Sequence, residues 1–133
     1  MATEQLLTLQ RKLERQARSM GARFFGVADL TVAQEAIVAQ GGEFLAAFPC
    51  ALAVGIALSD TIVDQLPRHK ELAVARTYDY LYYTVNRSLD QIALRLSVIL
   101  NEDGFPTLLI PASDKVDDEN LMGLFSHKLA ARL

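Results

Sequence analysis

The sequence predicts an α/β sandwich, in which a mixed sheet of about three or more strands is covered by helices in the order α-β-α-β-α-β-α. Three observations favour this α+β arrangement. Long segments repeat apolar residues at helical spacing, shorter apolar runs lie between them, and glycine or proline stands at most boundaries. The chain of 133 residues has no internal repeat or linker, so we expect residues 1–133 to form a single domain.

The two longest helices are predicted from apolar residues that recur every three or four positions. The first helix spans residues 3–20 and ends at Gly21. The longest helix spans residues 72–101 and ends before Gly104. Its apolar stripe consists of Tyr78, Leu81, Tyr82, Val85, Leu89, Ile92, Leu96 and Ile99.

Three shorter helices complete the helical set. Thr31 and Gln34 are spaced as a capping box, which predicts a helix that ends at about residue 40. A short helix is expected over residues 60–66, and the last helix over residues 121–133. The acidic residues 114–120 before that last helix are expected to form a loop.

Three apolar runs are predicted to be strands: residues 24–28, 50–58 and 107–110. The middle run is apolar without alternation, which is typical of a strand buried on both faces. Gly55 within it indicates that a strand backbone or a ligand comes close at that point. Cys50 opens the run and is expected to be a buried small hydrophobic residue rather than a reactive thiol.

Composition excludes several classes of function. The net charge of −3 argues against nucleic-acid binding, because phosphate contacts need a clustered excess of lysine and arginine. A single cysteine excludes an internal disulfide and any iron–sulfur cluster or zinc site with several thiolate ligands. No apolar segment reaches the 18 or so residues that a membrane span needs, and we expect a cytoplasmic protein.

The sequence carries no motif for nucleotide, metal or hydrolytic chemistry. Gly41 and Gly42 follow a predicted helix rather than a strand, so they do not form a phosphate-binding loop. The two histidines, His69 and His127, lie too far apart in sequence for a paired-histidine motif, and we expect no metal site. Ser126 and His127 are neighbours on one helix and point about 100° apart, which disfavours a nucleophile–base pair.

Polar residues on the long helix and near the third strand are the candidates for a ligand pocket. All four tyrosines of the chain lie within six positions, 78–83, where they anchor the helix on the sheet or form a flat wall for a large planar ligand. Ligands in α/β proteins gather at strand ends, and Ser113 places a hydroxyl shortly after the third predicted strand. The candidate cofactor-binding residues are Tyr80, Tyr83, Asn86, Pro111, Ser113, Ser126 and His127.

Five segments of the chain resemble, in order, the N-terminal region of the epoxyqueuosine reductase-like iron–sulfur proteins. They are residues 25–30 (FGVADL), 48–55 (FPCALAVG), 82–90 (YYTVNRSLD), 110–113 (IPAS) and 123–131 (GLFSHKLAA). The resemblance implies that a cobalamin lies between this region and a ferredoxin-like region with two [4Fe–4S] clusters. That second region would follow Leu133, so the chain would supply only one wall of the cofactor site.

Two departures from the family pattern bear on activity. The cluster-binding cysteines are absent from this chain. The tRNA-reducing members also carry a catalytic aspartate where this chain has residues 110–113. The resemblance therefore implies the cofactor-binding part of an oxidoreductase that is inactive by itself, and we assign no catalytic residue.

Two functions remain open at this stage. The first is a cobalamin-binding half-domain of a redox protein, which would receive electrons from a separate ferredoxin-like iron–sulfur partner. The alternative is a non-catalytic α/β interaction module that self-associates through an unpaired apolar sheet edge. Both hypotheses predict a homo-oligomer rather than a monomer.

Overall fold

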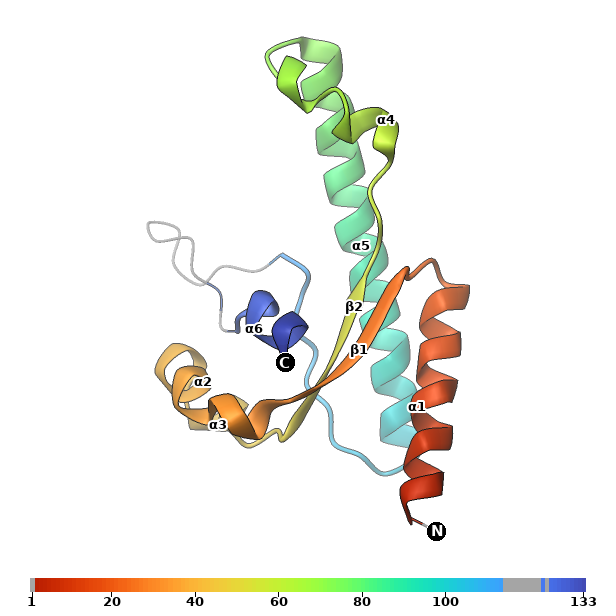
Figure 1. The fold of residues 1–133 in the computed structure, drawn as a ribbon, viewed down its shortest axis with the longest axis vertical. Helices are drawn as coiled ribbons and strands as arrows, with labels where there is room; N and C mark the ends of the chain where they lie inside the picture. Colours follow the sequence, from red (N-terminus) through yellow and green to blue (C-terminus); the bar gives the residue numbers. More distant parts are fainter. Residues whose placement is uncertain (1, 114–122, 124) are drawn as a thin grey trace.

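Helices surround a single two-stranded sheet in the structure, a computed structural model that describes residues 2–113, 123 and 125–133 (Figure 1). Among the described residues, the sheet and the helix α5 form the centre. The elements are α1 (Ala2–Ser19), β1 (Phe24–Asp29), the 3-10 helix η1 (Leu30–Ala33), α2 (Gln34–Gly41), α3 (Glu43–Ala46), β2 (Cys50–Gly55), α4 (Asp60–Val63), the 3-10 helix η2 (Leu66–Arg68), α5 (Leu72–Glu102) and α6 (His127–Arg132).

The predicted sandwich with a mixed sheet of three or more strands is wrong. Strands β1 and β2 pair antiparallel, with Phe24 opposite Gly55 and Asp29 opposite Cys50, and no third strand joins them among the described residues. Residues 107–110, the predicted third strand, are extended but pair with no strand. The order α-β-α-β-α-β-α is therefore wrong as well.

The predicted third strand is held by helix side chains instead of by a strand. The segment of residues 107–113, called the strap below, makes most of its described hydrogen bonds to α5. The hydroxyl of Thr107 donates to Oδ1 of Asn101 at 3.1 Å, and the N–H of Ala112 donates to Oδ1 of Asp90 at 2.8 Å. These contacts hold the strap against α5 rather than in the sheet.

The main core lies between α1, α5 and one face of the sheet (Figure 1). Alternate sheet residues Phe25, Leu52 and Val54 pack against it. Helix α1 ends where Gly21 adopts a φ of 106° and the N–H of Ala22 reaches the carbonyl of Ala17. The buried members of this core are Leu13, Ala17, Ala22, Ile92, Leu96 and Ile99.

A second apolar cluster packs α2, α3, the strap and α6 against the end of the sheet that contains Ala28 and Ala51. Its buried members are Ala28, Leu30, Ile37 and Leu45. The half-buried residues that pack on it include Ile110 of the strap and two residues near the C-terminus, Phe125 and Leu129. This cluster is what brings the strap and α6 to the same place as α2 and α3.

Two predictions about the sheet region are wrong. Strand β2 is half-buried rather than enclosed on both faces, because the sheet has two strands. Cys50 is exposed, since it occupies the last pair of the ladder. A Cβ at Gly55 would come within 3.1 Å of the Phe24 ring on the facing strand, so the protein group nearest to this glycine is a side chain.

The predicted short helices form with different bounds. The side chain of Asp29, rather than Thr31, caps the turn before α2 by accepting the N–H of Thr31, so the predicted capping box is wrong. The helix predicted over residues 60–66 is a single α-helical turn followed by η2. The last helix is α6, while residues 114–122 and 124 of the predicted loop and helix lie outside the described residues.

The N-terminal half of α5 extends past α1 and the sheet, accompanied by α4 and η2 (Figure 1). We call residues 60–86, which include α4, η2 and this half of α5, the arm. The arm contains no buried residue. None of the described helices combines the length and the apolar character that crossing a lipid bilayer requires.

Candidate functional site

Four of the predicted site residues lie together where the strap meets α6. Pro111 and Ser113 belong to the strap, and Ser126 and His127 form the start of α6. Nε2 of His127 lies 2.9 Å from the carbonyl oxygen of Pro111. A carbonyl oxygen can only accept, so Nε2 is the donor of this hydrogen bond.

Ser126 fixes the orientation of α6. Its Oγ accepts the N–H of Leu129 at 3.2 Å, as an N-cap residue does. A second anchor comes from α2, because Nε2 of Gln40 donates to the carbonyl oxygen of Gly123 at 2.9 Å. These two contacts and the second apolar cluster place His127 beside the strap.

Two residues of α5 complete this arrangement, and neither was among the predicted site residues. The hydroxyl of Tyr82 lies 3.2 Å from Oγ of Ser113, and Asp90 accepts the N–H of Ala112. Asn86, which was predicted, is half-buried midway between them in the sequence. Tyr82, Asn86 and Asp90 recur every four residues, so they share one face of the helix.

We call this set the strap site. The four-residue spacing of Tyr82, Asn86 and Asp90 was visible in the sequence and could have identified this face. Tyr82 was predicted to belong to the core stripe instead, because its spacing from Tyr78 and Leu89 also fits the apolar pattern. The strap site consists of Tyr82, Asn86, Asp90, Pro111, Ala112, Ser113, Ser126 and His127.

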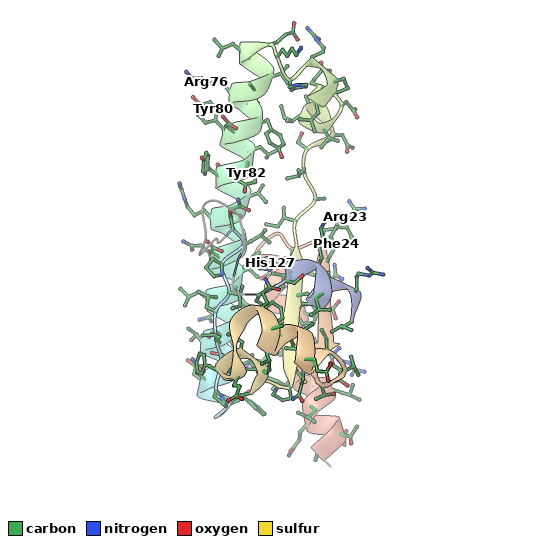
Figure 2. The ribbon with its side chains drawn as sticks, turned by 90° about the vertical axis from the view of Figure 1, so that its left-hand side faces the viewer. Arg23, Phe24, Arg76, Tyr80, Tyr82 and His127 are labelled. Carbon is green, nitrogen blue, oxygen red and sulfur yellow. The ribbon has the colours of Figure 1, made fainter. Side chains whose placement is uncertain are left out.

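The other two predicted residues, Tyr80 and Tyr83, do not join the strap site. Their side chains are 66% and 65% exposed on the outer face of the arm. Figure 2 shows Tyr80 higher on the arm than Tyr82, with His127 below both, in the body of the protein. Tyr83 touches the edge of the Tyr82 ring, with 5.6 Å between ring centroids, and so lies at the rim of the site.

The strap site offers neutral hydrogen-bonding groups. They are a phenol, two hydroxyls and a carboxamide, beside the imidazole of His127. Its one carboxylate, on Asp90, already accepts a backbone N–H. No three histidine, cysteine, aspartate or glutamate side chains gather as metal ligands in the described part of the chain. The arrangement is therefore suited to a ligand rich in amides or hydroxyls.

Relatives of known function do not add to this description. The chain was compared with protein-family models, with curated proteins and with solved structures. None of the three comparisons finds a match.

Proposed function

We propose that the strap site forms one wall of a binding site for a cobalamin-like corrinoid, as the cofactor-binding half of an epoxyqueuosine reductase-like redox protein. The proposal is supported by the meeting of three segments that are far apart in the sequence. Three segments that resemble the family, residues 82–90, 110–113 and 123–131, meet at the strap site through the Tyr82–Ser113 and His127–Pro111 hydrogen bonds. Segments that are far apart in sequence and share one ligand are expected to meet in this way.

The chemistry of the site fits the edge of a corrin ring, which carries neutral amide side chains. Tyr82, Asn86 and Ser113 supply donors and acceptors for amides, and they do so without a free charge that would need a counter-ion. Tyr83 borders the site and would add apolar surface at its rim.

The bound cofactor would supply electron transfer at its cobalt. This chain would bind the ring edge and hold its orientation through groups that the strap and α6 fix in place. The [4Fe–4S] clusters and the ferredoxin-like partner belong outside this chain, which would be inactive alone. A reducing, cytoplasmic setting is part of the same proposal.

Titration with hydroxocobalamin, followed by visible absorption, tests this function. We expect a saturable spectral shift at micromolar ligand. Tyr82→Phe removes the hydroxyl that meets Ser113 and should weaken binding about fivefold, because a neutral hydrogen bond contributes about 1 kcal/mol. Tyr80→Phe is the matched control and should leave the affinity unchanged. An unchanged spectrum at hundreds of micromolar ligand would contradict the proposal.

The sheet supports a second candidate, the self-associating module. Each strand of a two-stranded sheet has one edge without a strand partner among the described residues. Phe24 and Val27 of β1 are exposed beside such an edge. Exposed strand edges with apolar side chains favour pairing with a second copy.

Sedimentation velocity tests self-association through this strand edge. The module predicts a dimer that Val27→Lys converts to monomer, because a lysine on an edge strand opposes edge-to-edge pairing. Thr31→Lys adds the same charge outside the strand and should leave the dimer intact. A wild-type protein that sediments as a monomer at all concentrations would contradict self-association, and it would leave the cobalamin titration unaffected.

A further inference from the structure

A hollow lies on the side of α5 that faces away from the strap. Its volume is about 370 Å³, and its lining residues are Met20, Arg87, Ser88 and Gln91. Arg87 and Gln91 each follow a strap-site residue, Asn86 and Asp90, by one position. They are therefore turned by about 100° around the helix, and the hollow is separate from the strap site.

The lining has the chemistry of an anion site. The guanidinium of Arg87 carries five N–H donors, and Ser88 and Gln91 add a hydroxyl and a carboxamide. None of the described residues that line the hollow is a carboxylate. The two ion pairs found among the described residues, Arg18–Glu14 and Arg68–Glu71, do not involve Arg87.

An aromatic residue lies one helical turn before Arg87 on α5. Tyr83 precedes Arg87 by four residues, so the two lie on neighbouring turns of the same helix face. Its ring is largely exposed. Met20, at the end of α1, gives the hollow one apolar wall. A ligand bound by Arg87 could therefore place a planar group against the ring of Tyr83.

We propose that this hollow binds a small organic anion that combines a phosphate or carboxylate with a planar ring. The anionic group meets Arg87, Ser88 and Gln91, and the ring packs on Tyr83. The residues that meet the anion, Arg87, Ser88 and Gln91, take no part in the cobalamin proposal, which shares only Tyr83 at its rim. The two proposals can therefore fail separately.

The test is a titration of the full chain, followed by amide NMR, with phenyl phosphate, benzoate and inorganic phosphate as probes. We expect saturable shifts at the amides of Ser88 and Gln91. Ring packing on Tyr83 should make phenyl phosphate bind about fivefold more tightly than inorganic phosphate. Binding of benzoate as well as phenyl phosphate would support a general organic-anion site, whereas binding of phenyl phosphate without benzoate would support a phosphate as the natural anion.

Two variants separate a built site from general charge attraction. Arg87→Gln should weaken the binding of phenyl phosphate about tenfold or more, because it removes a charge-assisted hydrogen-bond donor. Arg76→Gln removes an exposed arginine elsewhere on α5 and should leave the affinity unchanged. Tyr83→Leu should abolish the advantage of phenyl phosphate over inorganic phosphate.

Three results would overturn the inference. One is the absence of any shift at Ser88 and Gln91 up to about 10 mM phenyl phosphate, a concentration beyond the millimolar limit of weak binding. Another is an equal loss of affinity in Arg87→Gln and Arg76→Gln. The third is equal binding of phenyl phosphate and inorganic phosphate by the wild-type protein. The unperturbed amide spectrum of each variant verifies that it is folded.

Discussion

The two halves of α5 belong to one continuous helix but lie in opposite environments. Ile92 in the C-terminal half is fully buried, at 0% exposure, whereas Leu72 in the N-terminal half is 71% exposed. The helix of 31 residues is about 46 Å long, and α1 with 18 residues reaches about 27 Å. The neighbours of α5 are too short to cover it, so its apolar stripe is buried only where α1 and the sheet lie beside it.

This difference shows that a segment can form a helix without being packed into the core. The spacing of apolar residues is the same along the whole of α5, and both halves are helical. The C-terminal half is held by tertiary packing, which supplies most of the stability of helices in proteins. The arm depends more on its own backbone hydrogen bonds and on α4.

The largest expected effect comes from truncating the buried half. Ile92→Ala should lower the free energy of unfolding by about 3 kcal/mol, because it removes apolar contacts and leaves a cavity in the core. Leu72→Ala, the control in the exposed half, should change it by less than about 0.5 kcal/mol. Urea unfolding measures both values, and equal losses would show that the two halves are equally packed.

Loss of the strap contact at the boundary between the halves should have the next largest effect. Asp90→Ala leaves the half-buried N–H of Ala112 without its acceptor and should cost about 2 kcal/mol of unfolding free energy. Asp79→Ala removes an exposed carboxylate from the arm and serves as the control. If the two variants unfold at the same urea concentration, Asp90 does not hold the strap.

Hydrogen exchange should report the same contrast without any substitution. We expect the backbone amides of residues 76–86 to exchange at least about tenfold faster than those of residues 92–99, because the arm can open without breaking the core. Amide exchange followed by NMR or mass spectrometry measures the two rates. Uniform protection along α5 would mean that something covers the arm in solution.

The smallest effect is expected at an exposed capping residue, Asp29. Its pKa lies below the ordinary 3.8, because its side chain accepts hydrogen bonds first from the hydroxyl and then from the N–H of Thr31. The stability from this cap is therefore complete above pH 3.8 and is lost as the pH falls through the lower pKa of the folded state.

Thr31→Val tests this cap by removing the hydroxyl while keeping the backbone N–H. The pKa of Asp29 should rise toward 3.8, with little change in stability at neutral pH. NMR titration of the carboxyl carbon measures the shift. Thr77→Val, which removes a hydroxyl from the arm, is the control and should leave the pKa of Asp29 unaltered.

The fold was predictable where local rules decide the structure. Periodicity predicted α1 and α5 within a few residues of their bounds, and the runs beginning at Phe24 and Cys50 form strands. Residues 107–110 have the same apolar character but form no strand. An extended segment joins a sheet only when a neighbouring strand supplies the hydrogen-bond partners of its backbone. Here the carboxylate of Asp90 on α5 accepts the N–H of Ala112, just after this run.

The candidate site was predictable in part. Ser113 and His127 were chosen for their hydrogen-bonding groups near the end of an extended segment, and the structure brings them to the same place. Tyr80 and Tyr83 were chosen as exposed neighbours of the core stripe, and they face outward. Tyr82 was missed because its place on α5 suits both the apolar stripe and the strap, and spacing cannot say which neighbour a residue meets.

By itself, the sequence determined where α1 and α5 form and where they end. These features follow from the spacing of apolar residues and from the left-handed backbone that glycine permits at Gly21 and Gly104. Only the tertiary structure decided that residues 107–113 lie on α5 rather than in the sheet, and that half of α5 stands outside the core. Both outcomes depend on contacts between segments far apart in the chain, which no local pattern encodes.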